Sequence, residues 1–462
     1  MNHADVTALS RDELLTLVGR LQEQVASLQA EVERLTRGGK RQAAPFSKGT
    51  RVEKPKRPGR KPGQGTFKRR EAPPSETLSE PPIDVPVAET GCPRCGGELA
   101  AERIDEASIT DLPEVVKPRV RLFRVAARRC GECGAAVRGR HPDLAPDQRG
   151  ASAHRLGPRI LAAAHHLHYG LGIPVRKLPA VLELLAGVRL TQGAITLDAL
   201  KKAAGAVGTA HQALGDSIRQ APYVHTDDTG WRVGGESAWL MVFETDAATV
   251  FQIRPRHRNQ EVRERIPADY PGVMITDRGR SYDAAELAGV KQQKCLAHVL
   301  RSLSAALERK TGRAHWFAAT LKTLLKRALT LGRELRSGPP PPSFAKRARL
   351  LKHEVARHLR DRPLSDRDNQ RLLDELGRHN DAGSLLRFLD DPRIEPTNNR
   401  AERALRPAVI ARKVSQCTKN DRGTRAFEAW TSVLRTLSRT TPSHALLDAV
   451  VALLKPQAAL PV

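Results

Sequence analysis

The chain has 462 residues, and 77 Lys and Arg against 51 Asp and Glu give it a net charge of +26. That length predicts two to four domains with a sizeable core. No run approaches 18 apolar residues, which excludes a membrane-spanning helix, and the acidic N-terminus is unlike a secretory signal. We therefore expect a cytoplasmic protein whose leading partner is a polyanion, although charge alone does not separate DNA from RNA or an anionic membrane.

Residues 1–37 are predicted to contain a coiled coil. Seven positions carry a heptad repeat of Leu and Val, with Leu at d and Val at a: Leu14, Val18, Leu21, Val25, Leu28, Val32 and Leu35. Leu at d with a β-branched residue at a favours two parallel helices, so we expect a homodimer or higher oligomer. The alternative is one amphipathic helix that lies on its own domain.

Residues 38–85 are predicted to form a disordered basic linker. Thirteen Lys and Arg lie from Arg37 to Arg70, Glu53 is the only acid there, and Pro and Gly in KRPGRKPGQG prevent regular structure. Such a span suits phosphate contact and counterion release, and the alternative is a solubilising linker. The candidate nucleic-acid-binding residues are Lys54, Lys56, Arg57, Arg60, Lys61, Lys68, Arg69 and Arg70.

Residues 86–145 carry two CxxC pairs, each followed by Gly. Two thiolates on a tight turn can reach one Zn²⁺, and two such turns complete a closed, structural site with four sulfur ligands. The alternative is four unligated thiols. The predicted zinc ligands are Cys92, Cys95, Cys130 and Cys133.

Residues 150–218 are predicted to be helical. The segment 175–187 and the helix after it resemble a helix-turn-helix, in which Gly187 ends the first helix and Thr191 caps the second. In a DNA-binding version the second helix would enter a major groove. An ordinary helical hairpin fits the sequence equally well.

From residue 219 to 440 the sequence predicts an α/β domain. Three strand-like runs separated by turns suggest an antiparallel meander, and alternating strands and helices follow, which implies a mixed sheet with helices on it. The expected strands are 223–233, 237–246, 249–255, 272–279 and the start of 291–303, and the expected helices are 259–266 and 282–288. Residues 441–462 are expected to be a C-terminal tail.

Three acids in this domain stand out by their positions. Asp227 and Asp277 are expected at strand ends, and Glu402 in the first turns of a helix that follows Pro396 and is capped by Thr397 or Asn398. Three carboxylates held on rigid elements suit two Mg²⁺ or Mn²⁺ ions, which would clamp the oxygens of a phosphoryl displacement. A single Asp of this kind would otherwise be a turn or cap residue. Glu395 is the next candidate for the third acid.

Four motifs in order resemble those of the insertion sequence 66 family of DDE transposases: HTDDTGWRV, ITDRGRSYDA, KCLAHVLRSL and PTNNRAERALRP. The coil, the basic stretch and the double CxxC match that family's layout, so the resemblance covers nearly the whole chain. It implies an RNase H-like mixed-sheet catalytic domain with Asp227, Asp277 and Glu402 as catalytic metal ligands. The family usually reads Asp-Glu-Thr at the first site, where this chain has Asp227-Asp228-Thr229. Asp227 occupies the aligned first position.

The resemblance extends to supporting residues and partners. Cys295-Leu-Ala-His298 matches a Cys-x-x-His element that many such transposases carry after the second aspartate, and plain packing is the alternative. The candidates for a supporting role are Asp228, Cys295, His298, Asn399 and Arg403. The implied partners are double-stranded DNA, at the element ends and the target, and small accessory proteins encoded by the same element. The implied location is the bacterial cytoplasm, with nucleoid association on DNA.

The 124 residues between Asp277 and Glu402 exceed what a minimal core needs. They are helix-rich and broken at 339–342 by four prolines, which predicts a helical insertion at about 300–390 whose Lys and Arg faces grip DNA or are simply solvated. Three functions follow: a transposase that cuts and joins strands, a catalytically inactive DNA-binding or regulatory derivative of the same fold, and a nuclease that only hydrolyses. The complete set of acids and motifs favours the transposase.

Overall fold

The computed structural model describes residues 10–39, 73–78, 81–85, 88, 92–98, 107–110, 116–145 and 147–454. It divides the chain into two compact units, one of residues 46–119 and one of residues 1–45 with 120–462. No helix within the described ranges is both long enough and apolar enough to cross a membrane. In the first unit the described residues include a short 3-10 turn, Ser75–Thr77, and the turn at 92–98.

The N-terminal helix α2 runs from Arg11 to Gly39 without a break. Its heptad side chains are exposed where they are described: Val18 47%, Leu21 49%, Val25 51%, Leu28 64% and Val32 61%. A row of apolar side chains at a and d positions that stays exposed in a single chain is typical of a helix that pairs with another copy. The coiled coil itself remains a prediction.

Four α-helices lie between residue 150 and the sheet: α3 (Pro158–His165), α4 (Leu178–Ala186), α5 (Gln192–Ala203) and α6 (Ala206–Ile218). The predicted boundaries of the helical pair are confirmed, because Gly187 ends α4 at φ 61° and the Thr191 hydroxyl accepts a hydrogen bond from the Ala194 N–H at 3.2 Å. A five-residue π-helix, His166–Gly170, interrupts the predicted helical run after α3.

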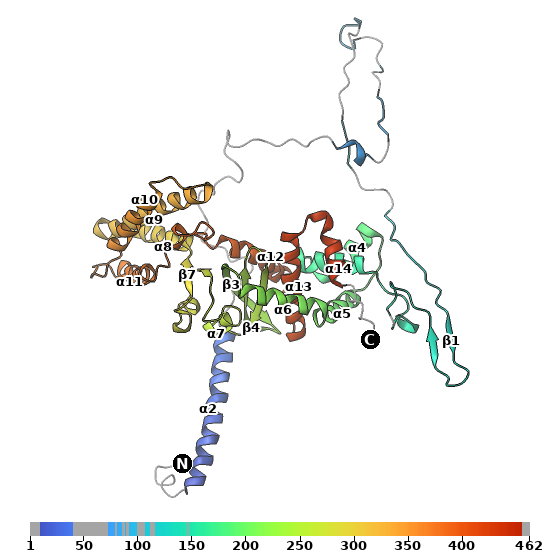
Figure 1. The fold of residues 1–462 in the computed structure, drawn as a ribbon, viewed down its shortest axis with the longest axis horizontal. Coiled ribbons are helices and arrows are strands. Elements are labelled where there is room, and N and C mark those ends of the chain that lie inside the picture. The colour runs from blue at the N-terminus through green and yellow to red at the C-terminus, as the bar shows by residue number, and fades with distance from the viewer. Residues whose placement is uncertain are drawn as a thin grey trace. The chain divides into compact units, whose positions relative to one another are not determined.

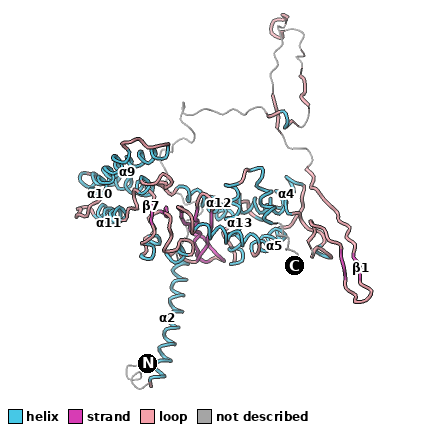
Figure 2. The backbone as a smooth tube through the Cα atoms, viewed as in Figure 1, coloured by secondary structure: helices cyan, strands magenta, loops and turns pink. Residues whose placement is uncertain are grey.

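The mixed sheet is confirmed and has five strands: β3 (Tyr223–Val233), β4 (Glu236–Glu244), β5 (Thr249–Arg254), β6 (Val273–Thr276) and β7 (Lys291–Lys294). The spatial order is β5-β4-β3-β6-β7. β3, β4 and β5 form the antiparallel meander, and β6 and β7 join β3 in parallel. Figure 2 shows strands in magenta among the cyan helices. β3 is therefore the central strand, shared by both halves of the sheet.

One expected helix in this region does not form. Residues 282–288 lie in two 3-10 turns, Arg280–Tyr282 and Ala285–Leu287, while the helix predicted after β5 is present as α7 (Asn259–Arg263). The segment is held instead by a contact from outside it, because the side-chain amide of Gln292 on β7 donates a hydrogen bond to the Tyr282 carbonyl at 2.6 Å. Tyr282 is buried instead and packs beneath the sheet with Val224 and Met274.

Helices cover both faces of the sheet. One face packs against α12 (Asn399–Ser415) and α13 (Asp421–Thr440) through a cluster that includes Trp231, Leu240 and Ala404. The other face packs against α6 and α7 through Val224 and Met241. Because successive strand residues point to opposite faces, this assignment also fixes the face of every polar residue on β3.

The predicted helical insertion is confirmed as four helices: α8 (Leu296–Arg309), α9 (Gly312–Ser337), α10 (Phe344–His358) and α11 (Arg367–Asp381). They share a core built from leucines such as Leu303, Leu325 and Leu351, which also includes Tyr223 and Ile275 of the sheet. Figure 1 shows α8 to α11 lying together. The run of prolines lies between α9 and α10.

The C-terminal segment, expected to be a tail, contains a packed helix. Residues Leu446–Leu454 form α14, whose Val450 and Leu454 are buried against α3 and α13. The indole N–H of Trp430 on α13 donates a hydrogen bond to the Ala199 carbonyl of α5. Helices α3, α5 and α6 therefore share one core with α13 and α14.

Candidate active site

Asp227 and Asp277 are brought together by the register of β3 and β6. The last parallel pair between the two strands is His225 with Ile275, and each aspartate lies two residues beyond that pair. Asp277 follows the end of β6 as predicted. Asp227 does not end its strand, because β3 continues to Val233 in antiparallel pairing with β4. The site thus lies where the parallel half of the ladder ends.

The two neighbouring aspartates of β3 point to opposite faces of the sheet. Asp227 shares its face with Trp231, which packs on α12, whereas Asp228 pairs with Met241 of the other face. There the Asp228 Oδ1 lies 3.2 Å from the Nδ1 of His257. Only Asp227 therefore faces the helix that carries Glu402.

The electrostatics of the site show three acids near one another. Burial, with the negative charges of Asp277 and Glu402, raises the pKa of Asp227 to about 7. Burial, with the charges of Asp227 and Asp277, raises the pKa of Asp228 to about 7. The charge of Glu402 raises the pKa of Asp227 but does not contribute to the shift at Asp228. This difference agrees with the placement of the two aspartates on opposite faces of the sheet.

Asp277 is held by its own loop. The backbone N–H of Gly279 donates a hydrogen bond to the Asp277 Oδ1 at 2.8 Å, and a Cβ at position 279 would lie 2.9 Å from that oxygen. The next residue, Arg278, reaches the insertion, where it donates to Glu375 at 2.9 Å and to Ser302 at 2.5 Å. The loop that orients the second aspartate is therefore tied to α8 and α11.

Glu402 lies in the first turn of α12, as the sequence predicts. The helix begins after Asn398, which is fully buried and does not cap it with its side chain. Instead the Asn398 amide donates to the Thr226 carbonyl at 2.8 Å, and its oxygen lies 3.3 Å from the Nδ1 of His225. The start of α12 is thereby anchored to β3 immediately before Asp227.

A second anchor comes from Arg400. Its guanidinium contacts Glu244 at 3.2 Å, Asp246 at 2.7 Å and the Thr245 carbonyl at 2.6 Å, all at the end of β4. Sequence reasoning singled out the neighbours Asn399 and Arg403, and both are exposed in the structure. Asn398 and Arg400 belong to the same PTNNRAER motif. The structure shows that Asn398, rather than Asn399, and Arg400, rather than Arg403, point into the protein.

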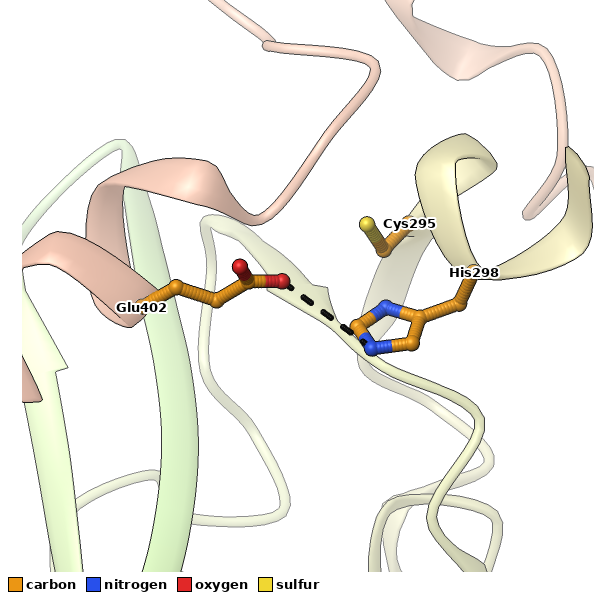
Figure 3. Close-up of side chains that lie close together, drawn as sticks. All are labelled: Cys295, His298 and Glu402. Carbon is orange, nitrogen blue, oxygen red and sulfur yellow. Dashed lines mark ion pairs between the residues drawn. The ribbon is translucent and has the colours of Figure 1, made fainter. Parts of the chain in front are cut away.

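Cys295 and His298 lie beside Glu402. They occupy the N-cap and first turn of α8, and their Sγ and imidazole nitrogen come with a Glu402 carboxylate oxygen within 4.8 Å of one another (Figure 3). The His298 Nε2 lies 3.9 Å from Glu402 Oε1, and Arg301 lies 3.7 Å from it. Among the described residues, Cys295, His298 and Glu402 are the three metal-ligating side chains whose ligand atoms lie this close together. The carboxylate oxygens of Asp227, Asp277 and Glu402 lie farther apart than that.

The residues present fit a divalent cation. Glu402 Oε1 is buried and has no hydrogen-bond partner among the described residues, and the negative charges of Asp277 and Glu402 act on Asp227. Oxygen-rich, electron-rich sites of this kind are those that Mg²⁺ and Mn²⁺ occupy in proteins. Asp227, Asp277 and Glu402 are accordingly the residues suited to hold such ions.

The two CxxC pairs form matching turns, each within its own unit. In the first, the Gly96 N–H donates to the Cys92 carbonyl at 2.7 Å, and Gly96 has φ 76°. In the second, the Gly134 N–H donates to the Cys130 carbonyl at 3.0 Å, and Gly134 has φ 70°. The positive φ explains why Gly follows each pair.

Backbone N–H groups surround the first thiol of each turn. Those of Arg94 and Cys95 lower the pKa of Cys92, and those of Cys133 and Glu132 lower the pKa of Cys130. The second turn lies at the tip of a hairpin of β1 (Ala127–Arg129) and β2 (Ala136–Arg138). Each pair is thus suited to a metal ligand role, and the shared four-sulfur site stays a prediction.

The eight candidate DNA-binding residues of the basic linker, from Lys54 to Arg70, lie outside the described residues. α5, the second helix of the helix-turn-helix-like pair, buries Ile195 and Ala199 against the core and leaves Leu197 exposed.

Two comparisons with known proteins bear on the chain. Residues 154–426 match the family model described as Transposase IS66 family. No curated protein matches the chain. The matched region contains the mixed sheet, the helical insertion and all three acids of the site. The chain belongs to the IS66 family of transposases.

Proposed function

We propose that the protein is a DDE transposase with an RNase H-like core, which binds the ends of its insertion sequence and catalyses metal-dependent strand cleavage and strand transfer. One observation carries the proposal. The β3–β6 register places Asp227 beside Asp277, on the sheet face covered by the helix of Glu402. Rigid strands and a helix start can hold three carboxylates in one arrangement.

The proposed chemistry divides between the ions and the protein. Two bound Mg²⁺ or Mn²⁺ ions would offset the charge of the phosphodiester and lower the pKa of the attacking water or 3′-hydroxyl. Asp227, Asp277 and Glu402 would hold those ions. Asn398 and Arg400 keep the first turn of α12 against β3 and β4, and so keep Glu402 near the aspartates. The Gly279 N–H keeps Asp277 in one rotamer.

DNA contact is proposed for two basic regions. The linker from Arg37 to Arg70 supplies thirteen cations. The insertion adds exposed cations such as Arg309, Lys326 and Arg349 on α8, α9 and α10. Several of its other cations already pair with acids, for example Arg327 with Glu354 at 2.5 Å. The unpaired ones are available for phosphates.

The flanking parts of the chain complete the proposal. One Zn²⁺ held by the two CxxC turns would stabilise a small module before the catalytic domain. Pairing of two α2 helices would join two transposase chains, as two element ends require. Accessory proteins of the same element and a bacterial, nucleoid-associated location are part of the proposal.

A strand-transfer assay tests this function. The full chain, with Mg²⁺, is incubated with DNA that carries the flanks of its own gene and with a target DNA. The proposal predicts cleavage at the element ends and covalent joining to the target, both lost in EDTA. Cleavage without joining would indicate a nuclease, and specific binding without either would indicate a regulatory derivative.

A further inference from the structure

A second cluster of metal-binding side chains overlaps the candidate active site. Cys295, His298 and Glu402 offer a thiol, an imidazole and a carboxylate within 4.8 Å of one another (Figure 3). Cys295 and His298 are three residues apart at the start of α8, a spacing that places both on one side of a helix. Glu402 approaches from the first turn of α12.

These three side chains lie close together but form no hydrogen bonds with one another. The 3.9 Å between His298 Nε2 and Glu402 Oε1 is too long for a hydrogen bond. Both Glu402 Oε1 and His298 Nδ1 are buried without a hydrogen-bond partner among the described residues. Buried polar atoms are nearly always paired, so two such atoms beside a buried thiol indicate a missing partner.

The backbone holds the two sides of this cluster together. The Asn398 N–H donates to the Cys295 Sγ at 3.2 Å, and the Leu296 N–H donates to the Pro396 carbonyl at 2.9 Å. The start of α8 is therefore attached to the segment that leads into α12. Donor atoms around a tetrahedral zinc lie roughly 3.3–3.6 Å apart, so rotamer shifts of about 1 Å would close the site.

We propose that Cys295, His298 and Glu402 bind a thiophilic divalent cation such as Zn²⁺, and that its binding inhibits the transposase by holding Glu402 away from Asp227 and Asp277. Sulfur and imidazole ligands select zinc-like ions over Mg²⁺, which prefers oxygen. Glu402 cannot serve both sites at once. The inhibitory part rests on the proposed function, whereas the binding part does not.

Binding is tested with Co²⁺, whose bond to a thiolate gives a charge-transfer absorption band. The full chain is first given one molar equivalent of zinc, which the four thiolates of the CxxC turns bind ahead of the three-ligand site, so that this site is still open when Co²⁺ is titrated. Cys295→Ser is compared with the parent and with Cys417→Ser, the other cysteine outside the CxxC pairs. We expect the band in the parent and in Cys417→Ser and its loss in Cys295→Ser. Equal bands in all three would overturn the site.

Inhibition is tested by adding Zn²⁺ to strand-transfer reactions at constant Mg²⁺. Each protein is normalised to its own rate without added zinc. We expect at least tenfold inhibition of the parent and of Cys417→Ser, and little inhibition of Cys295→Ser. Equal inhibition of Cys295→Ser would refute the regulatory role. If no protein transfers strands, the proposed function fails, while the cobalt band still decides whether the site binds metal.

Discussion

At the scale of single residues, the alternation of β3 separates two aspartates that the sequence places side by side. Asp227 faces α12 and Glu402, and Asp228 faces His257 on the opposite side of the sheet. Burial is the main cause that raises the pKa of each to about 7, and the charge of Glu402 adds to it at Asp227 alone. The raised pKa therefore does not tell the two aspartates apart. The face of β3 on which each side chain lies does, because only Asp227 lies on the face of Glu402.

A partly buried histidine away from the site gives a pH prediction. Burial, with the charges of Arg265 and Arg254, lowers the pKa of His211 to about 4. The unfolded chain takes up this proton near pH 6.5 and the folded chain only near pH 4, so the free energy of unfolding should fall as pH falls through that window. The full shift corresponds to about 3 kcal/mol at most.

Urea unfolding at several pH values measures this effect. In His211→Gln the decrease in unfolding free energy between pH 6.5 and pH 4 should be smaller than in the parent. His154→Gln, at an exposed position, is the control and should follow the parent. The idea fails if both variants keep the parent's pH dependence.

At the scale of elements, α12 is held in place by residues that are not themselves proposed metal ligands. Asn398 connects its first turn to Thr226 and Cys295, and Arg400 connects it to the end of β4. The helix therefore depends on contacts with β3, β4 and α8 together. Such contacts decide whether Glu402 reaches the aspartates.

Asn398→Ala should reduce strand cleavage strongly while DNA binding persists. The change leaves the Thr226 carbonyl without its partner, at a cost of about 1–3 kcal/mol, and releases the start of α12. Asn399→Ala removes the same side chain at the exposed neighbouring position and is the matched control. Cleavage rates and thermal unfolding of the two variants are compared. Equal cleavage by both would show that Asn398 does not position Glu402.

The exposed seam of α2 gives a prediction about assembly. Leu21→Lys with Leu28→Lys introduces two charges at d positions and should reduce the mass measured by light scattering to that of a smaller species. The control, Ala26→Lys with Ala30→Lys, adds the same charge at b and f positions and should keep the parent's mass. An unchanged mass for the Leu variant would show that α2 is not the contact between chains.

The sequence predicts elements better than their packing. Strands β3 to β7 follow from alternation and turn residues, and the helix start at Glu402 follows from Pro396. The sequence does not reveal the anchoring role of Asn398. Asn398 and Asn399 are the same residue type, and only the position of β3 decides which of them is buried against it. It also missed α14, a short apolar helix whose stability depends on α3 and α13 rather than on its own length.

At the scale of the whole molecule, charge and family membership point to the same partner. The net charge is +26, and thirteen of the cations lie between Arg37 and Arg70. The family match covers residues 154–426, so the basic linker lies outside it. We infer that the linker contacts DNA phosphates from outside the family-matched region, which holds the three acids.

Affinity for DNA should fall steeply with salt, largely through the linker. Replacing the eight candidate Lys and Arg between positions 54 and 70 with Gln keeps the length of the span and removes its phosphate contacts. The slope of log affinity against log salt should become shallower by several units, because fewer counterions are released. A slope equal to the parent's would assign the charge contact to the insertion.

The central claim is that Asp227, Asp277 and Glu402 act as one metal site. Its most direct test is strand cleavage and joining by Asp227→Asn beside Asp228→Asn, with DNA binding measured in parallel. Asn keeps the shape and removes the charge, so Asp227→Asn should bind DNA normally and lose roughly a thousandfold or more in rate. Asp228→Asn should retain more activity. The reverse ranking, or near-parental cleavage by Asp227→Asn, would contradict the account.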